Sequence, residues 1–203
     1  EYDLANVSEY LNTKAKIFPT FTPLIRGRLL SVKRLGSESL DSENIMEREA
    51  NLTWKEELPE SNEIIKGFWW KEGIAEAEVS VDDRVAKSMN LVLGDELYFS
   101  AGGTNFYATV TSFREVEWES FSPNFFFILS PSIGRTLPNS YITSIKIPEN
   151  SSTIKDFIER FPTITNIDIG SVIKQVQSTI SSASLAVQYI FVLALAAGIL
   201  ALI

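Results

Sequence analysis

The pattern of apolar and polar positions predicts a mixture of strands and helices over the first 170 residues or so. Strands are expected where apolar residues alternate with polar ones, or run together, between turn residues. These segments are Phe21–Lys33, Ala50–Trp54, Val79–Val81, Leu91–Ser100, Phe106–Val116, Phe125–Leu129, Tyr141–Ile147 and Thr163–Ile169. Helices are expected over the N-terminal residues, from Asp82 to about Met89, and from Ser152 to Phe161. The pattern therefore predicts an α+β fold.

The C-terminal part has a different pattern. Apolar residues three and four apart from Ile173 to Val187 predict an amphipathic helix that begins near Gly170. From Leu185 to Ile203 the chain has no charged residue, and a helix of about 20 such residues is long enough to cross a bilayer. A buried helix of a soluble domain is the alternative, although such a helix normally keeps a polar face. The pattern favours one helix that enters a membrane, in a chain that is part of a larger membrane protein.

Two features describe how the folded part is organised. The turn Ala101–Asn105, with Gly102 and Gly103 in it, predicts a hairpin between the two strands that flank it. A short helix leads through a Phe-Pro pair into a β-rich run at Phe18–Pro19 and again at Phe161–Pro162. This likeness indicates two related βαβ-like halves in one sheet, with Leu35–Leu137 inserted between them.

The composition narrows the possible chemistry. The 203 residues include 26 acidic and 18 basic side chains, which give a net charge of -8. Nucleic acids and anionic lipids are bound through basic surfaces, so both are disfavoured as partners. The sequence has no histidine and no cysteine, which excludes Ser-His-Asp and Cys-His catalysis and the usual zinc sites. We therefore expect no catalytic residue, no metal and no cofactor.

Two groups of aromatic residues are candidates for contact with a partner or ligand. They are Trp69 with Trp70, and the run Phe125, Phe126 and Phe127. Such residues more often pack in a core or between domains, because large aromatic side chains dominate the energetics of both. If part of the phenylalanine run is exposed, it would form an interaction surface.

Two alternatives from other functional classes remain open at this point. One is a membrane-anchored envelope enzyme that acts on glycans or lipids through carboxylates such as Glu115, Glu117 or Glu119. At that spacing the three would share one face of a strand, and such a face is more often simply solvated. The other alternative is a membrane-anchored envelope sensor or binding module without transport activity.

Three motifs in order carry a resemblance to a known family: REANLTW (Arg48–Trp54), VEWESFSPNFFFI (Val116–Ile128) and FPTITNIDIGSVIKQV (Phe161–Val176). With the apolar segment that follows, they resemble the FtsX-like or MacB-like permease subunits of bacterial ABC transporters, in the YbbP-type branch. The resemblance covers most of the chain from about Arg26 onward. It implies a domain that lies between two membrane spans of a larger permease.

The resemblance also implies an architecture and a role. Residues 1–35 and 138–170 would form a porter-like α/β core, 36–137 a β-rich inserted subdomain, 171–184 a stalk helix and 185–203 a truncated transmembrane helix. The folded part would lie in the periplasm, on the outer side of the bacterial inner membrane. A cytoplasmic ABC ATPase subunit would move it, since the chain has no G-x-x-x-x-G-K-[ST] loop of its own.

Family members of this branch are associated with the export or extraction of lipid-like or hydrophobic compounds, with an envelope esterase or lysophospholipase as partner. Gly170 is the candidate hinge between the folded part and the helix that follows it.

Overall fold

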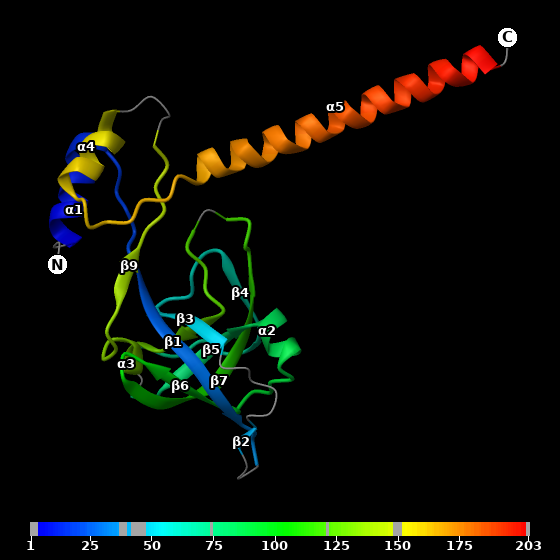
Figure 1. The fold of residues 1–203 in the computed structure, drawn as a ribbon. Coiled ribbons are helices and arrows are strands. Elements are labelled where there is room, and N and C mark those ends of the chain that lie inside the picture. Colours follow the sequence, from blue (N-terminus) through cyan, green and yellow to red (C-terminus); the bar gives the residue numbers. More distant parts are fainter. Residues whose placement is uncertain are drawn as a thin grey trace. The chain divides into compact units, whose positions relative to one another are not determined.

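The alternating segments of the sequence fold into the strands of one mixed sheet (Figure 1). The computed structural model describes residues 4–36, 40–41, 48–73, 75–120, 122–147 and 152–201, and the chain divides into two compact units, Asp3–Ile147 and Pro148–Ile203. The first unit contains α1 (Leu4–Tyr10), the π-helix η1 (Leu11–Ala15), β1 (Thr22–Lys33), β2 (Leu40–Asp41), β3 (Arg48–Trp54), β4 (Asn62–Gly67), β5 (Glu78–Asp82), α2 (Asp83–Ser88), β6 (Glu96–Ala101), β7 (Thr104–Val116), β8 (Phe127–Leu129), α3 (Pro131–Gly134) and β9 (Ser140–Ile142). The second unit contains α4 (Ser152–Arg160) and α5 (Ile169–Ala201).

Six strands of the first unit close into a ring. In order round the ring they are β1, β3, β8, β5, β7 and β6, and β6 pairs back with β1. The pairs β3 with β8 and β5 with β7 are parallel, and the other four pairs are antiparallel. Closing a sheet in this way removes its free edges. β2 and β9 pair with β1 from outside the ring, and β4 pairs with β7.

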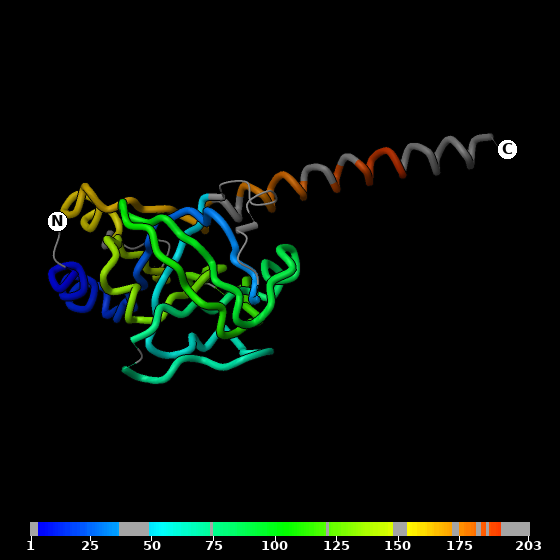
Figure 2. Tube along the Cα trace, turned by 90° about the horizontal axis from the view of Figure 1, so that it is seen from below, coloured from blue at the N-terminus to red at the C-terminus, as the bar shows by residue number. Residues whose placement is uncertain are grey.

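Apolar side chains fill the inside of the ring. Along β6, every second residue is buried, namely Leu97, Phe99 and Ala101, because successive side chains of a strand point to opposite faces. The ring of Phe99 meets that of Phe127 edge-on, with centroids 5.4 Å apart. Figure 2 shows the backbone course of this unit from below. The predicted α+β class is confirmed.

Two local predictions hold in detail. Gly102 and Gly103 form the turn between β6 and β7 with φ values of 59° and 82°, which side chains other than glycine rarely adopt. Asp82 caps α2, and its Oδ1 accepts hydrogen bonds from the backbone N–H groups of Arg84 at 3.0 Å and Val85 at 3.2 Å. Both features follow from short-range chemistry that the sequence displays directly.

Other predictions need correction. The strand expected at Thr163–Ile169 is wrong: α4 ends at Arg160, α5 begins at Ile169, and no strand lies between them. The strand expected at Tyr141–Ile147 is reduced to β9, which pairs with β1 through three residues. The porter-like βαβ core is therefore not confirmed. β1 was predicted in the core and β3 and β6 in the insertion, yet all three strands belong to the same ring. The domain boundaries stay a prediction.

A single helix does leave the region of Gly170, as expected. It is α5, with 33 residues. Across the residues that the structure describes, no helix combines the length and the apolarity that crossing a membrane requires. The predicted span over Leu185–Ile203, and the stalk before it, are therefore not confirmed. The side chains from Val192 to the end of the chain lie outside the described residues.

Candidate functional site

A groove of about 510 Å³ opens beside the end of β3. Aromatic and apolar side chains form one part of its lining, from Phe21, Pro23, Trp54 and Tyr141, and the segment Lys55–Glu60 forms the rest. Tyr141 reaches the groove because β9 pairs with the start of β1, where Pro23 lies opposite Tyr141. The volume is within the range of small-molecule sites, which is about 300–1,000 Å³. The sheet therefore places three aromatic side chains, distant in sequence, around one hollow.

The charged groups of the groove are partly paired. Glu56 forms an ion pair with Arg135, whose guanidinium also lies 5.3 Å from the centre of the Trp54 ring. Lys55 Nζ donates a hydrogen bond to Thr22 Oγ1 at 3.1 Å. Burial lowers the pKa of Lys55 below its ordinary value.

Two further carboxylates lie on the exposed part of the lining. They are Glu57 and Glu60. Neither has an ion-pair partner in the described part of the chain. Because Arg135 neutralises Glu56 and Lys55 offsets only one carboxylate, the groove keeps a surplus of negative charge.

The predicted pair Trp69 and Trp70 lies directly against the backbone of this segment. The indole N–H of Trp69 donates to the carbonyl oxygen of Glu56 at 2.8 Å, and that of Trp70 donates to the carbonyl of Lys55 at 3.0 Å. The ring centroids of the pair are 3.8 Å apart, and Trp70 is only 5% exposed. The pair holds one side of the groove in place, and direct contact with a ligand stays a prediction.

The predicted phenylalanine run lies elsewhere, at β8. Phe125 and Phe127 are buried, while Phe126 is 47% exposed and packs against Trp118 with ring centroids 4.7 Å apart. Phe127 lies opposite Leu52 of β3 in the ring of strands. Two of the three phenylalanines therefore belong to the core, and Phe126 is the one with a free surface. Its role as a partner contact stays a prediction.

Arg114 is a central residue that the sequence analysis missed. Its side chain is fully buried, with Nη1 donating to Asn62 Oδ1 at 2.9 Å and Nη2 donating to the Phe125 carbonyl at 2.6 Å. Burial lowers the pKa of Arg114 to about 10, against the opposing influence of Asp82, so the group stays charged at neutral pH. The signal available in the sequence was a lone arginine in a long predicted strand. The contacts join β4 and β7 to the segment before β8.

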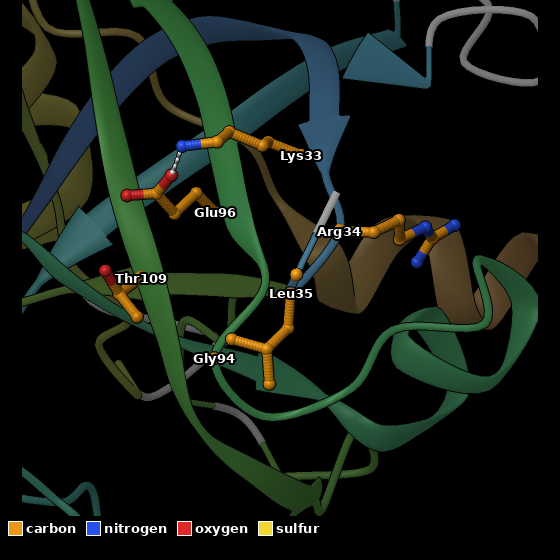
Figure 3. Close-up of a pocket in the computed structure, with 7 residues that line it drawn as sticks. Lys33, Arg34, Leu35, Gly94, Glu96 and Thr109 are labelled. Atoms are coloured by element: carbon orange, nitrogen blue, oxygen red, sulfur yellow. Dashed lines mark hydrogen bonds and ion pairs between the residues drawn. The ribbon is translucent and has the colours of Figure 1, made fainter. Parts of the chain in front are cut away.

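A smaller hollow, of about 220 Å³, lies where β1 ends near β6 and β7 (Figure 3). Lys33 Nζ and Glu96 Oε2 form an ion pair at 2.7 Å in it. Its volume is below the usual range for small-molecule sites. We assign it no ligand.

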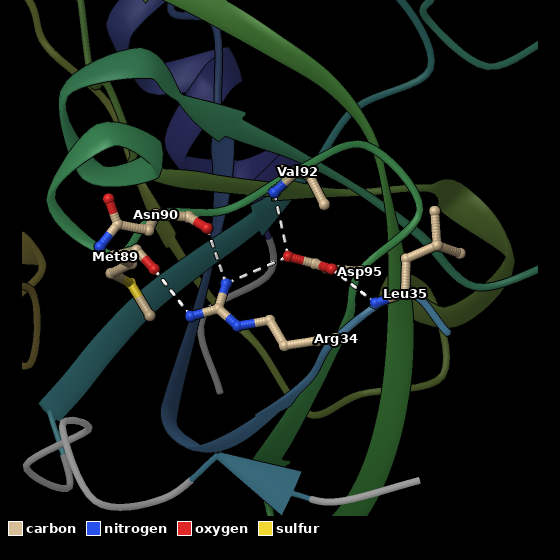
Figure 4. A network of polar contacts seen from close by, with 6 residues as sticks. All are labelled: Arg34, Leu35, Met89, Asn90, Val92 and Asp95. Atoms are coloured by element: carbon tan, nitrogen blue, oxygen red, sulfur yellow. Dashed lines mark hydrogen bonds and ion pairs between the residues drawn. The ribbon is translucent and has the colours of Figure 1, made fainter. Parts of the chain in front are cut away.

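Next to this hollow lies the buried carboxylate of Asp95 (Figure 4). Asp95 Oδ1 accepts the N–H of Leu35 at 2.8 Å, and Oδ2 accepts the N–H of Val92 at 3.0 Å and Nη1 of Arg34 at 3.2 Å. Arg34 also donates to the carbonyls of Met89 and Asn90. This network ties the end of β1 to the loop between α2 and β6, which is a structural role.

The carboxylates of the enzyme alternative do not share a strand face. β7 ends at Val116, so Glu115 lies in the strand while Glu117 and Glu119 lie in the turn after it. That part of the prediction is wrong. The described residues also contain no group of three or more acidic side chains placed to hold a metal ion.

The predicted hinge residue, Gly170, is the second residue of α5. Asp168 caps the helix: its Oδ1 accepts the N–H of Ser171 at 3.0 Å, and its carbonyl accepts the Ser171 hydroxyl at 2.9 Å. Gly170 thus lies in a capped first turn, and its role as a hinge stays a prediction.

A comparison with known proteins shows what the chain is similar to. Over 184 residues, 91% of its length, it is 35% identical to the uncharacterized ABC transporter permease YbbP of Escherichia coli (strain K12). The chain resembles a segment of an ABC transporter permease. It spans 22% of that relative's length. No family model matches the chain. The similarity supports a transport-related permease segment and does not select the FtsX-like or MacB-like branch.

Proposed function

We propose that this chain is an extracytoplasmic domain of an ABC transporter permease of the FtsX-like or MacB-like kind, and that it moves when a separate cytoplasmic subunit hydrolyses ATP. The similarity of 91% of the chain to a permease is the observation that supports this most. The sequence has no G-x-x-x-x-G-K-[ST] phosphate-binding loop, which is compatible with ATP chemistry in a separate subunit. A sensor without transport activity is less well supported, because the similarity is to a transporter.

The second part of the proposal concerns α5 as the element that transmits movement. A helix of 33 residues is roughly 50 Å long and has a capped beginning. Many hydrogen-bonded turns in succession make such a rod stiff, so a displacement at one end reaches the other. In the proposal its apolar C-terminal part connects to the inner membrane, and the first unit lies in the periplasm.

The third part concerns the substrate, for which we propose lipid-like or hydrophobic compounds that are exported or extracted from the membrane. The groove supports it, because the aromatic lining by Phe21, Trp54 and Tyr141 suits an apolar ligand. A periplasmic esterase or lysophospholipase is the proposed further partner, from the family resemblance alone.

The experiment uses the complete permease with its ATPase subunit in lipid nanodiscs. A fluorescent lysophospholipid is placed in the bilayer, and its ATP-dependent release to albumin is measured. Helix variants Gln177→Gly, Ser181→Gly and Ser184→Gly are combined in one protein, and the matched control has alanine at the same three exposed positions. Glycine costs a helix about 1 kcal/mol per residue relative to alanine, so the triple variant loses about 3 kcal/mol of helix stability.

We expect ATP-dependent release by the wild type and the alanine control, and loss of release in the glycine variant while ATP hydrolysis continues. Equal release by the glycine and alanine variants would contradict the role of α5. Hydrolysis without any release of the probe would contradict the lipid-like substrate.

A further inference from the structure

The groove beside β3 combines aromatic faces with unpaired carboxylates, and this combination selects one type of ligand. Apolar lining alone would accept any hydrophobic compound. Here Glu57 and Glu60 lie on the lining without a described ion-pair partner, next to Phe21, Trp54 and Tyr141. Aromatic rings attract cations through their negative faces, and carboxylates attract them by charge.

The protein already uses this chemistry for one of its own side chains. Trp54 and Glu56 both line the groove. The guanidinium of Arg135 lies 5.3 Å from the centre of the Trp54 ring and forms an ion pair with Glu56. In this internal contact, one aromatic ring and one carboxylate of the lining hold a guanidinium group between them. Tyr141, which is 46% exposed, and Phe21 offer further aromatic surface in the same groove.

The charge balance points the same way. Once Arg135 has neutralised Glu56, the lining has one cation, Lys55, against the two carboxylates of Glu57 and Glu60. Lys55 is also held by its hydrogen bond to Thr22 Oγ1. An anionic ligand would meet a surplus of like charge, whereas a cation would complete the balance.

We propose that this groove binds an organic cation with an apolar body, such as a quaternary ammonium compound with an aromatic or alkyl group. The apolar body would lie against Phe21, Trp54 and Tyr141, and the cationic group near Glu57 and Glu60. The choice of an apolar body rests on the proposed function, and the preference for positive charge rests on the groove itself.

The test measures binding to the full chain in a detergent-free polymer, without transport. The probe is benzyltrimethylammonium, with benzyl alcohol as the neutral analogue and benzenesulfonate as the anionic one. Binding is followed by tryptophan fluorescence and by ligand-observed NMR. The double variant Glu57→Gln/Glu60→Gln is compared with Glu63→Gln/Glu72→Gln, which removes the same charge from exposed positions that do not line the groove.

We expect the cation to bind about tenfold more tightly than either analogue, a ratio in keeping with one cation–π contact and one ion pair. The Glu57/Glu60 variant should lose that preference, and the Glu63/Glu72 control should keep it. Lys55→Met should tighten binding of the cation, because it removes the opposing charge.

Equal binding of the three probes, equal effects of the two double variants, or no binding of the cation would each overturn the proposal. None of these results would affect the release of a lipid probe by the complete permease, so the failure of this inference is distinguishable from failure of the proposed function.

Discussion

Replacing Asp95 by alanine should destabilise the first unit strongly. The carboxylate is fully buried and accepts hydrogen bonds from the backbone N–H groups of Leu35 and Val92 and from the guanidinium Nη1 of Arg34. A hydrogen bond to a charged group contributes about 1.5–3 kcal/mol. Arg34 keeps two carbonyl acceptors, so the loss comes mainly from the two backbone groups and amounts to about 4 kcal/mol. That is a large part of the stability of an ordinary domain, about 5–15 kcal/mol.

The isosteric change Asp95→Asn separates hydrogen bonding from packing. The amide oxygen can still accept one backbone N–H, while its NH₂ group faces the other donor, so we expect a loss of about 2 kcal/mol. Asp83→Ala is the control. It removes a carboxylate whose ion-pair partner, the Lys87 side chain, is 76% exposed, so it should change stability little.

The assay is urea unfolding of the chain followed by tryptophan fluorescence. All four tryptophans belong to the first unit, so the signal reports the unfolding of that unit. If Asp95→Ala unfolds at the same urea concentration as Asp83→Ala, the energetic interpretation of the network in Figure 4 is refuted.

Two further predictions test other parts of the fold. Gly102→Ala should be clearly less stable than Gly103→Ala in thermal unfolding. Both positions have positive φ, but a Cβ at Gly102 would overlap the ring of Pro138, while one at Gly103 meets nothing within 4 Å. Equal losses of stability would contradict this. Burial, with a contribution from Glu76, raises the pKa of Glu78 above its ordinary 4.5. The stability contributed by its protonated form is therefore present below pH 4.5 and lost as the pH rises through the raised pKa. Over that pH range the stability of Glu78→Gln should rise relative to that of the wild type, and above it the difference should stay constant. A stability difference that does not depend on pH would contradict this.

The parts of the fold that the sequence predicted are those set by neighbouring residues. Alternation along β6, glycines in the hairpin turn and the carboxylate of Asp82 act over a few residues, and all three were predicted. β4 was missed, because this outer strand buries Asn62 and exposes most of the rest, so its sequence lacks an alternating apolar face. Thr163–Ile169 alternates but pairs with no strand in the described part of the chain, and alternation without a partner does not form a sheet.

Ring closure and the groove depend on contacts between distant residues, which periodicity does not encode. Gly27 of β1 pairs with Ala101 of β6 where the ring closes, and Pro23 pairs with Tyr141 at the groove. The tryptophan pair was predicted as a partner or ligand contact. Its observed contacts are with the backbone at Lys55 and Glu56, and the predicted role stays a prediction. No sequence motif marked the carboxylates that line the groove.

The most direct test of the central claim is whether the first unit moves when ATP is hydrolysed. The sequence has no native cysteine, so Glu63→Cys on the exposed part of β4 allows a dye to be attached within this chain at one position. In the complete permease, reconstituted with its ATPase subunit, energy transfer from this dye to acceptor lipids reports its height above the bilayer. We expect different heights with ATP and with ADP. The same height with both nucleotides, in a labelled permease that still hydrolyses ATP, would contradict the proposed movement.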